Sequence, residues 1–427
     1  MADRTSTESI QLTRLQHLIG ELEKGNEFYR GRLKEAGLDS GLESLGQFTE
    51  KMPFTSKMDL VWDREEFPPY GSNVTYPLSE YSRYCQSSGT TRGPLPSLDT
   101  AESWSAMLDC WDRVFEAAGV STSDVVFFAF SFGPFLGFWT AFESATRRGN
   151  LSIPGGGLGS KARLQAMVAD DADVLCCTPT YALRLGEVFA ETREAASYRL
   201  KKIIVAGEPG GSLPEVRQKI SDLWKGAEIF DHHGMTEVGP VTYEHPDKPL
   251  SLCVIEDAYF AEVIDRETHQ EVKPGEKGEL VLTTLTRTAC PLLRYRTGDL
   301  VDKSFFSPEG SDEPVFCLEG GILGRVDEMV VIRGVNIYPT AVEKIIRGFP
   351  EVVEFQVIQT TRQSMAELEV SIEAAEGANK DLAERIAREL ADAFTLRIPV
   401  TLVESGALPR FEFKSKRWIQ NTDRTES

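Results

Sequence analysis

Residues 174–177 read Val-Leu-Cys-Cys and residues 203–206 read Ile-Ile-Val-Ala, two short apolar runs with a helical stretch between them. Comparable strand-like runs lie at 125–130 and 228–230, again separated by helical stretches. Residues 100–118 carry large apolar side chains every three or four positions, which is typical of a helix with one buried face. Because buried strands that alternate with helices are typical of layered α/β proteins, we expect an α/β fold with helices packed on a sheet.

The pattern changes twice toward the C-terminus. From residue 259 it becomes a series of alternating strands, at 259–264 and 279–283, which indicates a β-rich subdomain. After Gly324-Arg325, strands and two helical stretches form a compact α+β unit of about a hundred residues. We therefore expect two domains, a large one at residues 1–323 and a small one at residues 324–427.

The 427-residue chain has 46 lysines and arginines against 66 aspartates and glutamates, a net charge of −20. This acidity argues against nucleic acid or an anionic membrane as a partner, because both attract surfaces rich in lysine and arginine. The most apolar stretch, residues 125–139, is shorter than a membrane span and contains glycine and proline. The first residues lack a secretory signal pattern, and the seven scattered cysteines do not suggest a disulfide framework. We therefore expect a cytoplasmic protein.

Four segments carry residue types suited to nucleotide chemistry. They are Ser-Ser-Gly-Thr-Thr-Arg-Gly-Pro at 87–94, His-Gly-Met-Thr-Glu at 233–237, Arg-Tyr-Arg-Thr-Gly-Asp at 294–299, and the stretch from Gly324 to Pro339. The backbone N–H groups of a loop such as 87–94 can converge on an anion, and Arg92 would add positive charge. Glu237 follows a tight glycine turn, as suits a Mg²⁺ ligand, and Asp299 can accept both hydroxyls of a ribose. Taken singly, each segment is also compatible with an ordinary loop.

In their order and spacing, the four segments resemble the adenylate-forming superfamily, specifically the phenylacetate–CoA ligase family. The resemblance implies a large adenylate-forming domain followed by a small mobile domain. It also implies two steps: a carboxylate attacks the α-phosphate of ATP, giving an acyl-adenylate and pyrophosphate, and CoA then displaces AMP. We therefore expect an ATP-dependent, AMP-forming aryl-CoA ligase that uses Mg²⁺ and activates an aromatic carboxylic acid.

Two alternatives to this function stay open. Biosynthetic relatives pass the acyl group to a carrier protein or an amine, and a degenerate nucleotide-binding protein would perform no reaction. The resemblance also makes a homodimer a candidate assembly, because relatives are often homodimers.

Carried over onto matching positions, the resemblance implies a nucleotide site built from several loops. Its members are Ser88, Gly89, Thr90, Thr91 and Arg92 at the β- and γ-phosphates, Gly207, Glu208, Pro209 and His233 along the adenine, and Asp299 and Arg325 at the ribose or phosphates. Two positions depart from the family pattern, since Arg92-Gly93 replaces Gly-Lys and His233 replaces a tyrosine. Arginine keeps the charge but changes the geometry, and a neutral imidazole can still stack on a base.

Three further residues are implied in the chemistry itself. Thr236 and Glu237 would meet the α-phosphate and Mg²⁺, and Lys414 would be the mobile cation that the small domain supplies. The alternative for Lys414 is an ordinary basic tail, because Lys416 and Arg417 are its neighbours. The resemblance also implies that the small domain rotates between the two half-reactions, with the hinge at Gly324-Arg325.

The acyl pocket is implied near the strand-to-loop segment that follows residue 130. Phe132, Phe135 and Phe138 would give flat apolar walls suited to an aryl ring, although such residues are equally typical of a core. Glu208 or His232 would bind a polar ring substituent, and Gly234 is placed beside them.

Some family members carry a structural zinc, and the corresponding positions here hold His245, Cys253, Cys317 and Glu319. Two thiolates, an imidazole and a carboxylate are chemically able to bind tetrahedral Zn²⁺. The alternative is that these are ordinary residues of a site that has been lost.

Overall fold

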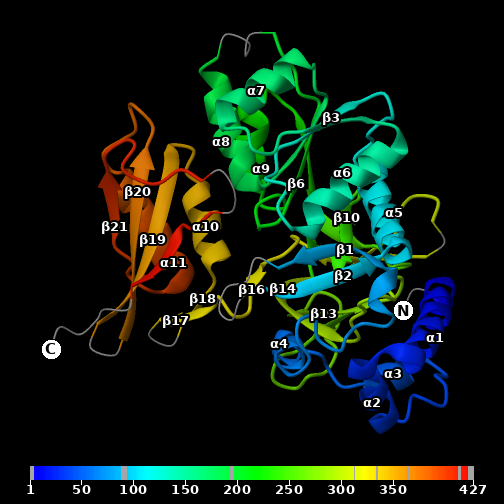
Figure 1. Ribbon diagram of the computed structural model, residues 1–427. Coiled ribbons are helices and arrows are strands. Elements are labelled where there is room, and N and C mark those ends of the chain that lie inside the picture. Colours follow the sequence, from blue (N-terminus) through cyan, green and yellow to red (C-terminus); the bar gives the residue numbers. More distant parts are fainter. Residues whose placement is uncertain are drawn as a thin grey trace.

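The computed structural model describes residues 4–87, 94–192, 197–311, 313–332, 335–362, 365–411 and 415–421. Figure 1 shows a larger part of the chain joined by a short connection to a smaller part that contains the C-terminus. The residues predicted to bind the β- and γ-phosphates or to act as the mobile cation lie outside the described residues; they are Ser88, Gly89, Thr90, Thr91, Arg92 and Lys414. Among the described helices, none is long and apolar enough to cross a membrane.

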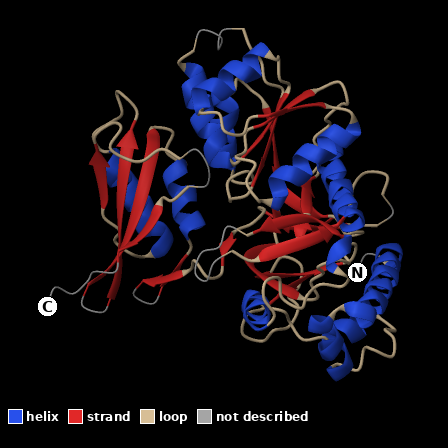
Figure 2. Ribbon diagram, in the orientation of Figure 1, coloured by secondary structure: helices blue, strands red, loops and turns tan. Residues whose placement is uncertain are grey.

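The larger part contains a five-stranded parallel sheet. Its strands are β3 (Val125–Phe128), β4 (Leu151–Pro154), β5 (Val174–Cys177), β6 (Lys202–Ala206) and β7 (Glu228–His232), in the order β4-β3-β5-β6-β7. Helices cover both faces (Figure 2): α5 (Ala101–Ala117) and α6 (Leu136–Arg148) on one, and α7 (Ser160–Ala169), α8 (Pro179–Ala190) and α9 (Pro214–Leu223) on the other. Phe127 packs with α7–α9, whereas Val126 and Phe128 pack with α5 and α6. The predicted α/β fold is confirmed.

An antiparallel sheet accounts for the predicted β-rich subdomain. In the order β10-β11-β15-β14-β13-β12, with β16 paired to β14, its strands are β10 (Thr242–Glu244), β11 (Ser251–Val254), β12 (Tyr259–Ile264), β13 (Lys277–Thr284), β14 (Tyr295–Phe306), β15 (Val315–Glu319) and β16 (Gly324–Arg325). Three short elements flank it: the hairpin β1 (Tyr81–Gln86) and β2 (Pro96–Thr100), the hairpin β8 (Gly234–Met235) and β9 (Gly239–Pro240), and the 3₁₀ turn Leu78–Glu80.

Four N-terminal helices pack against this antiparallel sheet (Figure 1): α1 (Thr5–Gly25), α2 (Glu27–Glu35), α3 (Leu45–Lys51) and α4 (Lys57–Glu66). Their core includes Leu285 and Leu293, which follow β13 and precede β14. The segment before α4 joins the sheet directly, because Thr55 exchanges backbone hydrogen bonds with Arg294 and Arg296. Ser56 begins α4 with a capping box that includes Asp59. This attachment fixes the first residue of α4, Lys57, beside the turn after β7.

The smaller part is an α+β unit, and we call it the small domain from β17 onward. It contains the hairpin β17 (Val330–Ile332) and β18 (Val335–Ile337), the sheet β21-β20-β19-β22, and two helices. Their bounds are β19 (Val352–Arg362), β20 (Met365–Ala374), β21 (Val400–Val403), β22 (Trp418–Asn421), α10 (Pro339–Arg347) and α11 (Leu382–Phe394). Strand β22, which pairs in parallel with β19, was not predicted from the sequence.

Candidate active site

The carboxyl ends of the parallel strands carry many of the predicted site residues. β6 leads into Gly207, Glu208 and Pro209, and β7 ends at His232 and leads into the turn at 233–237. β3 leads into the loop that contains Phe132 and Phe135. In open α/β sheets, ligands bind beyond the carboxyl ends of the strands. The fold therefore brings the predicted adenine, α-phosphate and acyl segments to one edge of the sheet.

Asp299 joins two other residues of the predicted nucleotide site. Its Oδ2 lies 3.1 Å from Nε2 of His233, and Nη1 of Arg325 donates to its Oδ1 at 2.9 Å. Burial alone would raise the pKa of Asp299, but the hydrogen bond from His233 and the charge of Arg325 outweigh it and hold the pKa below its ordinary value. Among the described residues, the buried Nδ1 of His233 has no hydrogen-bond partner. A polar atom of a bound nucleotide would satisfy it.

Arg287, which the sequence analysis did not select, holds the Thr236-Glu237 turn in place. Its side chain is 2% exposed, and Nη1 donates to the carbonyl oxygens of Thr236 at 3.1 Å and Glu237 at 2.8 Å. Nε and Nη2 bind the two carboxylate oxygens of Asp99 at 2.8 and 2.6 Å, and Nη2 also donates to Oγ of Ser97 at 2.6 Å. All five N–H donors of the guanidinium are thus used. The arginine ties the turn after β7 to strand β2.

Glu237 is partnered by a second residue that the sequence analysis missed. Nζ of Lys57, at the start of α4, lies 2.9 Å from Oε1 of Glu237. The glutamate side chain is 12% exposed and the lysine side chain 46%. Within the described ranges no three or more His, Cys, Asp or Glu side chains form a metal-binding group. Glu237, the predicted ligand, would offer Mg²⁺ one carboxylate. Such a donor set fits Mg²⁺, which takes most of its ligands from phosphate oxygens and water.

The predicted acyl-site phenylalanines are half-buried rather than enclosed in the core. Phe138 stacks on Phe130 with ring centroids 4.2 Å apart, and Phe132 packs edge to face on Trp139. The backbone of Phe132 adopts a φ of +48°, which is uncommon for a bulky residue and is found mainly where the surroundings hold it. Its ring lies against Gly156, where a Cβ would come within 2.9 Å of Cδ2. The loop therefore presents an aromatic surface that remains partly accessible.

Three residues were predicted beside these rings, His232, Glu208 and Gly234, and their contacts differ. Nδ1 of the buried His232 donates to the Thr242 carbonyl oxygen at 2.6 Å, and burial lowers the pKa of this imidazole to about 4. The ring is therefore neutral at pH 7, and its Nε2 is an acceptor. Both carboxylate oxygens of Glu208 already accept main-chain N–H groups. Gly234 packs so closely on its hairpin partner that a Cβ would lie 2.7 Å from the Gly239 carbonyl oxygen.

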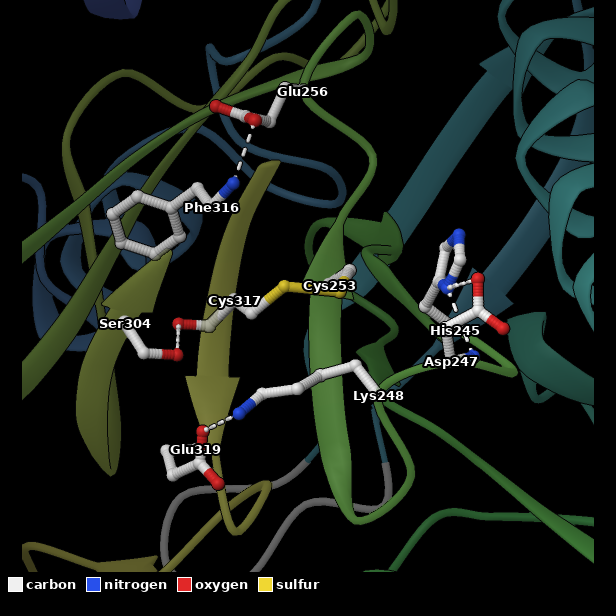
Figure 3. Close-up of a disulfide and its surroundings, with 9 residues drawn as sticks. All are labelled: His245, Asp247, Lys248, Cys253, Glu256, Ser304, Phe316, Cys317 and Glu319. Atoms are coloured by element: carbon white, nitrogen blue, oxygen red, sulfur yellow. Dashed lines mark hydrogen bonds and ion pairs between the residues drawn. A yellow bond between two sulfur atoms is a disulfide. The ribbon is translucent and has the colours of Figure 1, made fainter. Parts of the chain in front are cut away.

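The predicted zinc site is wrong. Figure 3 shows Cys253 and Cys317, which face each other across β11 and β15, joined as a disulfide. Glu319 instead binds Nζ of Lys248 at 2.7 Å, and Nδ1 of His245 lies 3.8 Å from the carboxylate of Asp247. The predicted ligand set requires both cysteines as thiolates, and both sulfurs are consumed by the bond to each other. The disulfide also departs from the expectation of a chain without such bonds.

Asp231, beside His232, makes stability depend on pH. Ser212 Oγ and the His232 N–H donate to its carboxylate at 2.6 and 2.9 Å, and burial raises the pKa of Asp231 to about 7. The folded state therefore binds this proton more tightly than the unfolded state, and the resulting stabilisation is lost as the pH rises through about 7. We expect Asp231→Asn to gain melting temperature relative to the wild type as the pH rises from about 4 to about 7, and the difference to level off above pH 7. Thermal unfolding across this range checks it; a pH-independent difference would contradict it.

Two family models match the chain: AMP-binding enzyme over residues 85–286 and AMP-binding enzyme C-terminal domain over residues 334–422. A phenylacetate–coenzyme A ligase of Thermus thermophilus is 32% identical over 439 aligned residues, covering 96% of this chain and 95% of that protein. This chain belongs to the phenylacetate–CoA ligase family. The predicted family is thus confirmed, and so is the reaction, an ATP-dependent, AMP-forming adenylation followed by thioester formation with CoA.

Solved structures of 2-hydroxyisobutyryl-CoA ligase share the fold of this phenylacetate–CoA ligase family member. In the postadenylation state with 2-HIB-AMP, that ligase is 27% identical, covers 97% of this chain and 89% of its own, and superposes with a TM-score of 0.89. In the thioesterification state with 2-HIB-AMP and CoA, the identity is also 27%, the coverage 99% and 91%, and the TM-score 0.72. The arrangement of the two parts of this chain is therefore nearer to the postadenylation state.

Proposed function

We propose that the acid activated by this ligase is a small aromatic carboxylic acid. The observation that supports this most directly is the half-buried aromatic surface of Phe132, Phe135 and Phe138 at the carboxyl end of β3. Flat apolar walls suit an aryl ring. The name of the Thermus thermophilus relative points to the same class of acid. The neutral His232 would accept a hydrogen bond from an amino or hydroxyl substituent on the ring.

A panel of acids tests this proposal. Aryl acids, arylacetic acids and short aliphatic hydroxy acids would each be incubated with ATP, with and without CoA, while pyrophosphate and acyl-CoA are measured. We expect pyrophosphate release and acyl-CoA formation to be greatest with an aromatic acid. Faster turnover of an aliphatic hydroxy acid would contradict the proposed substrate class. Pyrophosphate release without acyl-CoA would show that the acid tested is adenylated but is not carried on to the thioester.

In the proposed mechanism, the carboxylate oxygen of the acid attacks the α-phosphorus of ATP, and the bond to the bridging oxygen breaks as pyrophosphate leaves. Such a transfer needs positioning and charge stabilisation rather than covalent help from the protein. Asp299 would bind the ribose hydroxyls, and His233 would face the adenine. In the second step the CoA sulfur attacks the acyl carbon, the thiol proton is lost, and AMP leaves.

Thr236 and Glu237 would support the α-phosphate, because Arg287 fixes the turn that carries them. Glu237 would hold Mg²⁺, which supplies electrostatic stabilisation of the phosphate oxygens when it is bound. Lys57 lies beside the same carboxylate and would add positive charge next to the phosphates. The acidic chain would thus concentrate its cations locally where ATP binds.

Glu237→Gln is expected to raise the Mg²⁺ concentration needed for half-maximal adenylation by roughly tenfold or more, because an amide oxygen carries no charge for the cation. Acid-dependent pyrophosphate release measured across a Mg²⁺ series checks this. Lys57→Met provides the contrast, because it removes the cation beside Glu237 but leaves the carboxylate, so the Mg²⁺ concentration needed for half-maximal adenylation should not rise. An unchanged Mg²⁺ dependence in Glu237→Gln would contradict the assignment of Glu237 to the metal.

We also propose that the small domain rotates between the half-reactions, with the hinge near Gly324-Arg325. β16 at these residues is the last strand of the antiparallel sheet, and the next strand, β17, already belongs to the small domain. The difference in superposition onto the two states of 2-hydroxyisobutyryl-CoA ligase supports this proposal. The present arrangement would serve the first half-reaction.

A further inference from the structure

Glu208 connects the two parts of the chain through its carboxylate. It follows β6, and its Oε1 accepts the N–H of Thr180 in the first turn of α8 at 2.9 Å. Its Oε2 accepts the N–H of Ser415 in the small domain at 2.9 Å. Ser415 is the residue after Lys414. One carboxylate thus binds main-chain donors from both sides of the domain interface.

Arg417 makes a second contact across the same interface. Its Nη1 donates to Oγ1 of Thr180 at 3.2 Å, while Nε and Nη2 bind the carboxylate oxygens of Glu354 in β19 at 2.6 and 3.1 Å. The carbonyl oxygen of Arg417 also accepts the Val357 N–H at 2.7 Å. Residues 415–417 are therefore attached to Glu208 through Ser415, and to both α8 and the small-domain sheet through Arg417.

A third contact lies nearby, where Nζ of Lys219 in α9 donates to the Val352 carbonyl oxygen at 2.6 Å. Glu208 differs from Lys219 because its acceptor carboxylate reaches the chain immediately next to Lys414. A hydrogen bond to an ionised carboxylate is stronger than one between neutral groups. Any rotation of the small domain that displaces Ser415 from Glu208 must break this hydrogen bond.

We infer that Glu208 is a positioning residue for adenylation, which holds Ser415 of the small domain against the large domain only in the present orientation. The inference rests on the proposed domain rotation and on the proposed role of Lys414. Glu208 would thus act in the first half-reaction and not in the second, because its contact with Ser415 is lost when the small domain turns.

Glu208→Gln tests this with little change of shape. A carboxylate has two acceptor oxygens, whereas an amide has one, so the variant places an NH₂ group against one of the two N–H donors. We expect acid-dependent ATP–pyrophosphate exchange to fall by about tenfold to a hundredfold, in line with the loss of a hydrogen bond to a charged group. Thioester formation from supplied acyl-adenylate and CoA is expected to stay within about twofold.

Glu191→Gln is the matched control, because it makes the same chemical change at an exposed position at the end of α8. We expect it to keep both half-reactions within about twofold of the wild type. Thr180→Val, which removes the partner of Arg417, is expected to lower exchange in the same direction as Glu208→Gln but less. An equal loss of both half-reactions in Glu208→Gln would overturn the inference, because it would indicate damage to α8.

The domain orientation can be measured without any acid. Fluorescent labels at Leu158→Cys and Leu402→Cys, both exposed positions on opposite sides of the interface, would report the distance between the two parts. We expect Glu208→Gln to shift the transfer efficiency away from the wild-type value. No shift would overturn the inference even if exchange falls. If the wild type exchanged pyrophosphate with none of the acids tested, the proposed function would be contradicted. The inference about Glu208 would still be decided, because the label measurement tests the contact between Glu208 and Ser415 separately.

Discussion

Replacing Lys414 with alanine is expected to lower the rate of adenylate formation by about a hundredfold or more with folding intact. The expected cause is the loss of a cation where negative charge develops on the α-phosphate and the leaving pyrophosphate, in a step that depends on electrostatic stabilisation. Acid-dependent ATP–pyrophosphate exchange measures the rate, and thermal unfolding measures the stability.

Lys416→Ala is the natural control, because Lys416 has the same charge two residues away. We expect it to change the exchange rate only slightly. Thioester formation from supplied acyl-adenylate should also survive in Lys414→Ala, since the small domain would have turned by then. An unchanged exchange rate in Lys414→Ala would remove this lysine from the mechanism. Equal losses in the two variants would instead favour a basic tail that attracts ATP without acting on one phosphate.

Replacing Arg287 with methionine is expected to destabilise the fold by about 3–5 kcal/mol, because it leaves the carboxylate of Asp99 buried without its ion-pair partner. Denaturant unfolding gives the change in free energy. Arg385→Met is the matched control, since Arg385 pairs with Glu351 at the surface, with side chains 37% and 33% exposed. Loss of such an exposed pair costs about 0–1 kcal/mol. Equal destabilisation by the two variants would contradict this prediction.

Arg287→Lys separates the catalytic consequence from the structural one. A lysine keeps the positive charge near Asp99 but has three donors instead of five, so it cannot also bind both carbonyl oxygens of the Thr236-Glu237 turn. We expect a folded enzyme whose adenylation is slower and needs more Mg²⁺, because Glu237 is no longer fixed. Titration with Mg²⁺ distinguishes this from a general loss of stability.

Much of the fold could be predicted from the local pattern of apolar residues in the sequence. The face of α5 was predicted because Trp104, Leu108, Trp111 and Phe115 recur at helical spacing, and all four are buried. Four strands of the parallel sheet, β3, β5, β6 and β7, were predicted because short apolar runs fit a sheet covered on both faces. Strand β4 was missed, because Leu151–Pro154 ends in a proline and is exposed or half-buried along its length. Strand β22 was missed because Trp418–Asn421 has no such run, and it forms only beside β19.

The site residues that depend on distant partners could not be predicted in this way. Arg287 gains its role from Asp99, which lies 188 residues earlier in the chain. Cys253 and Cys317 are 64 residues apart, and only the register of β11 against β15 shows that they meet as a disulfide rather than as zinc ligands. The positive φ of Phe132 is likewise set by its surroundings and not by its residue type.

That disulfide has a consequence for an enzyme whose second substrate is a thiol. Exchange between a thiol and a disulfide requires the attacking sulfur to reach one of the two bonded sulfurs. Cys253 and Cys317 are both 0% exposed in the folded chain. The CoA thiol can therefore react with the acyl-adenylate without reducing this disulfide. Reductants in an assay buffer would meet the same barrier until the protein unfolds, at which point the free thiols would oppose refolding.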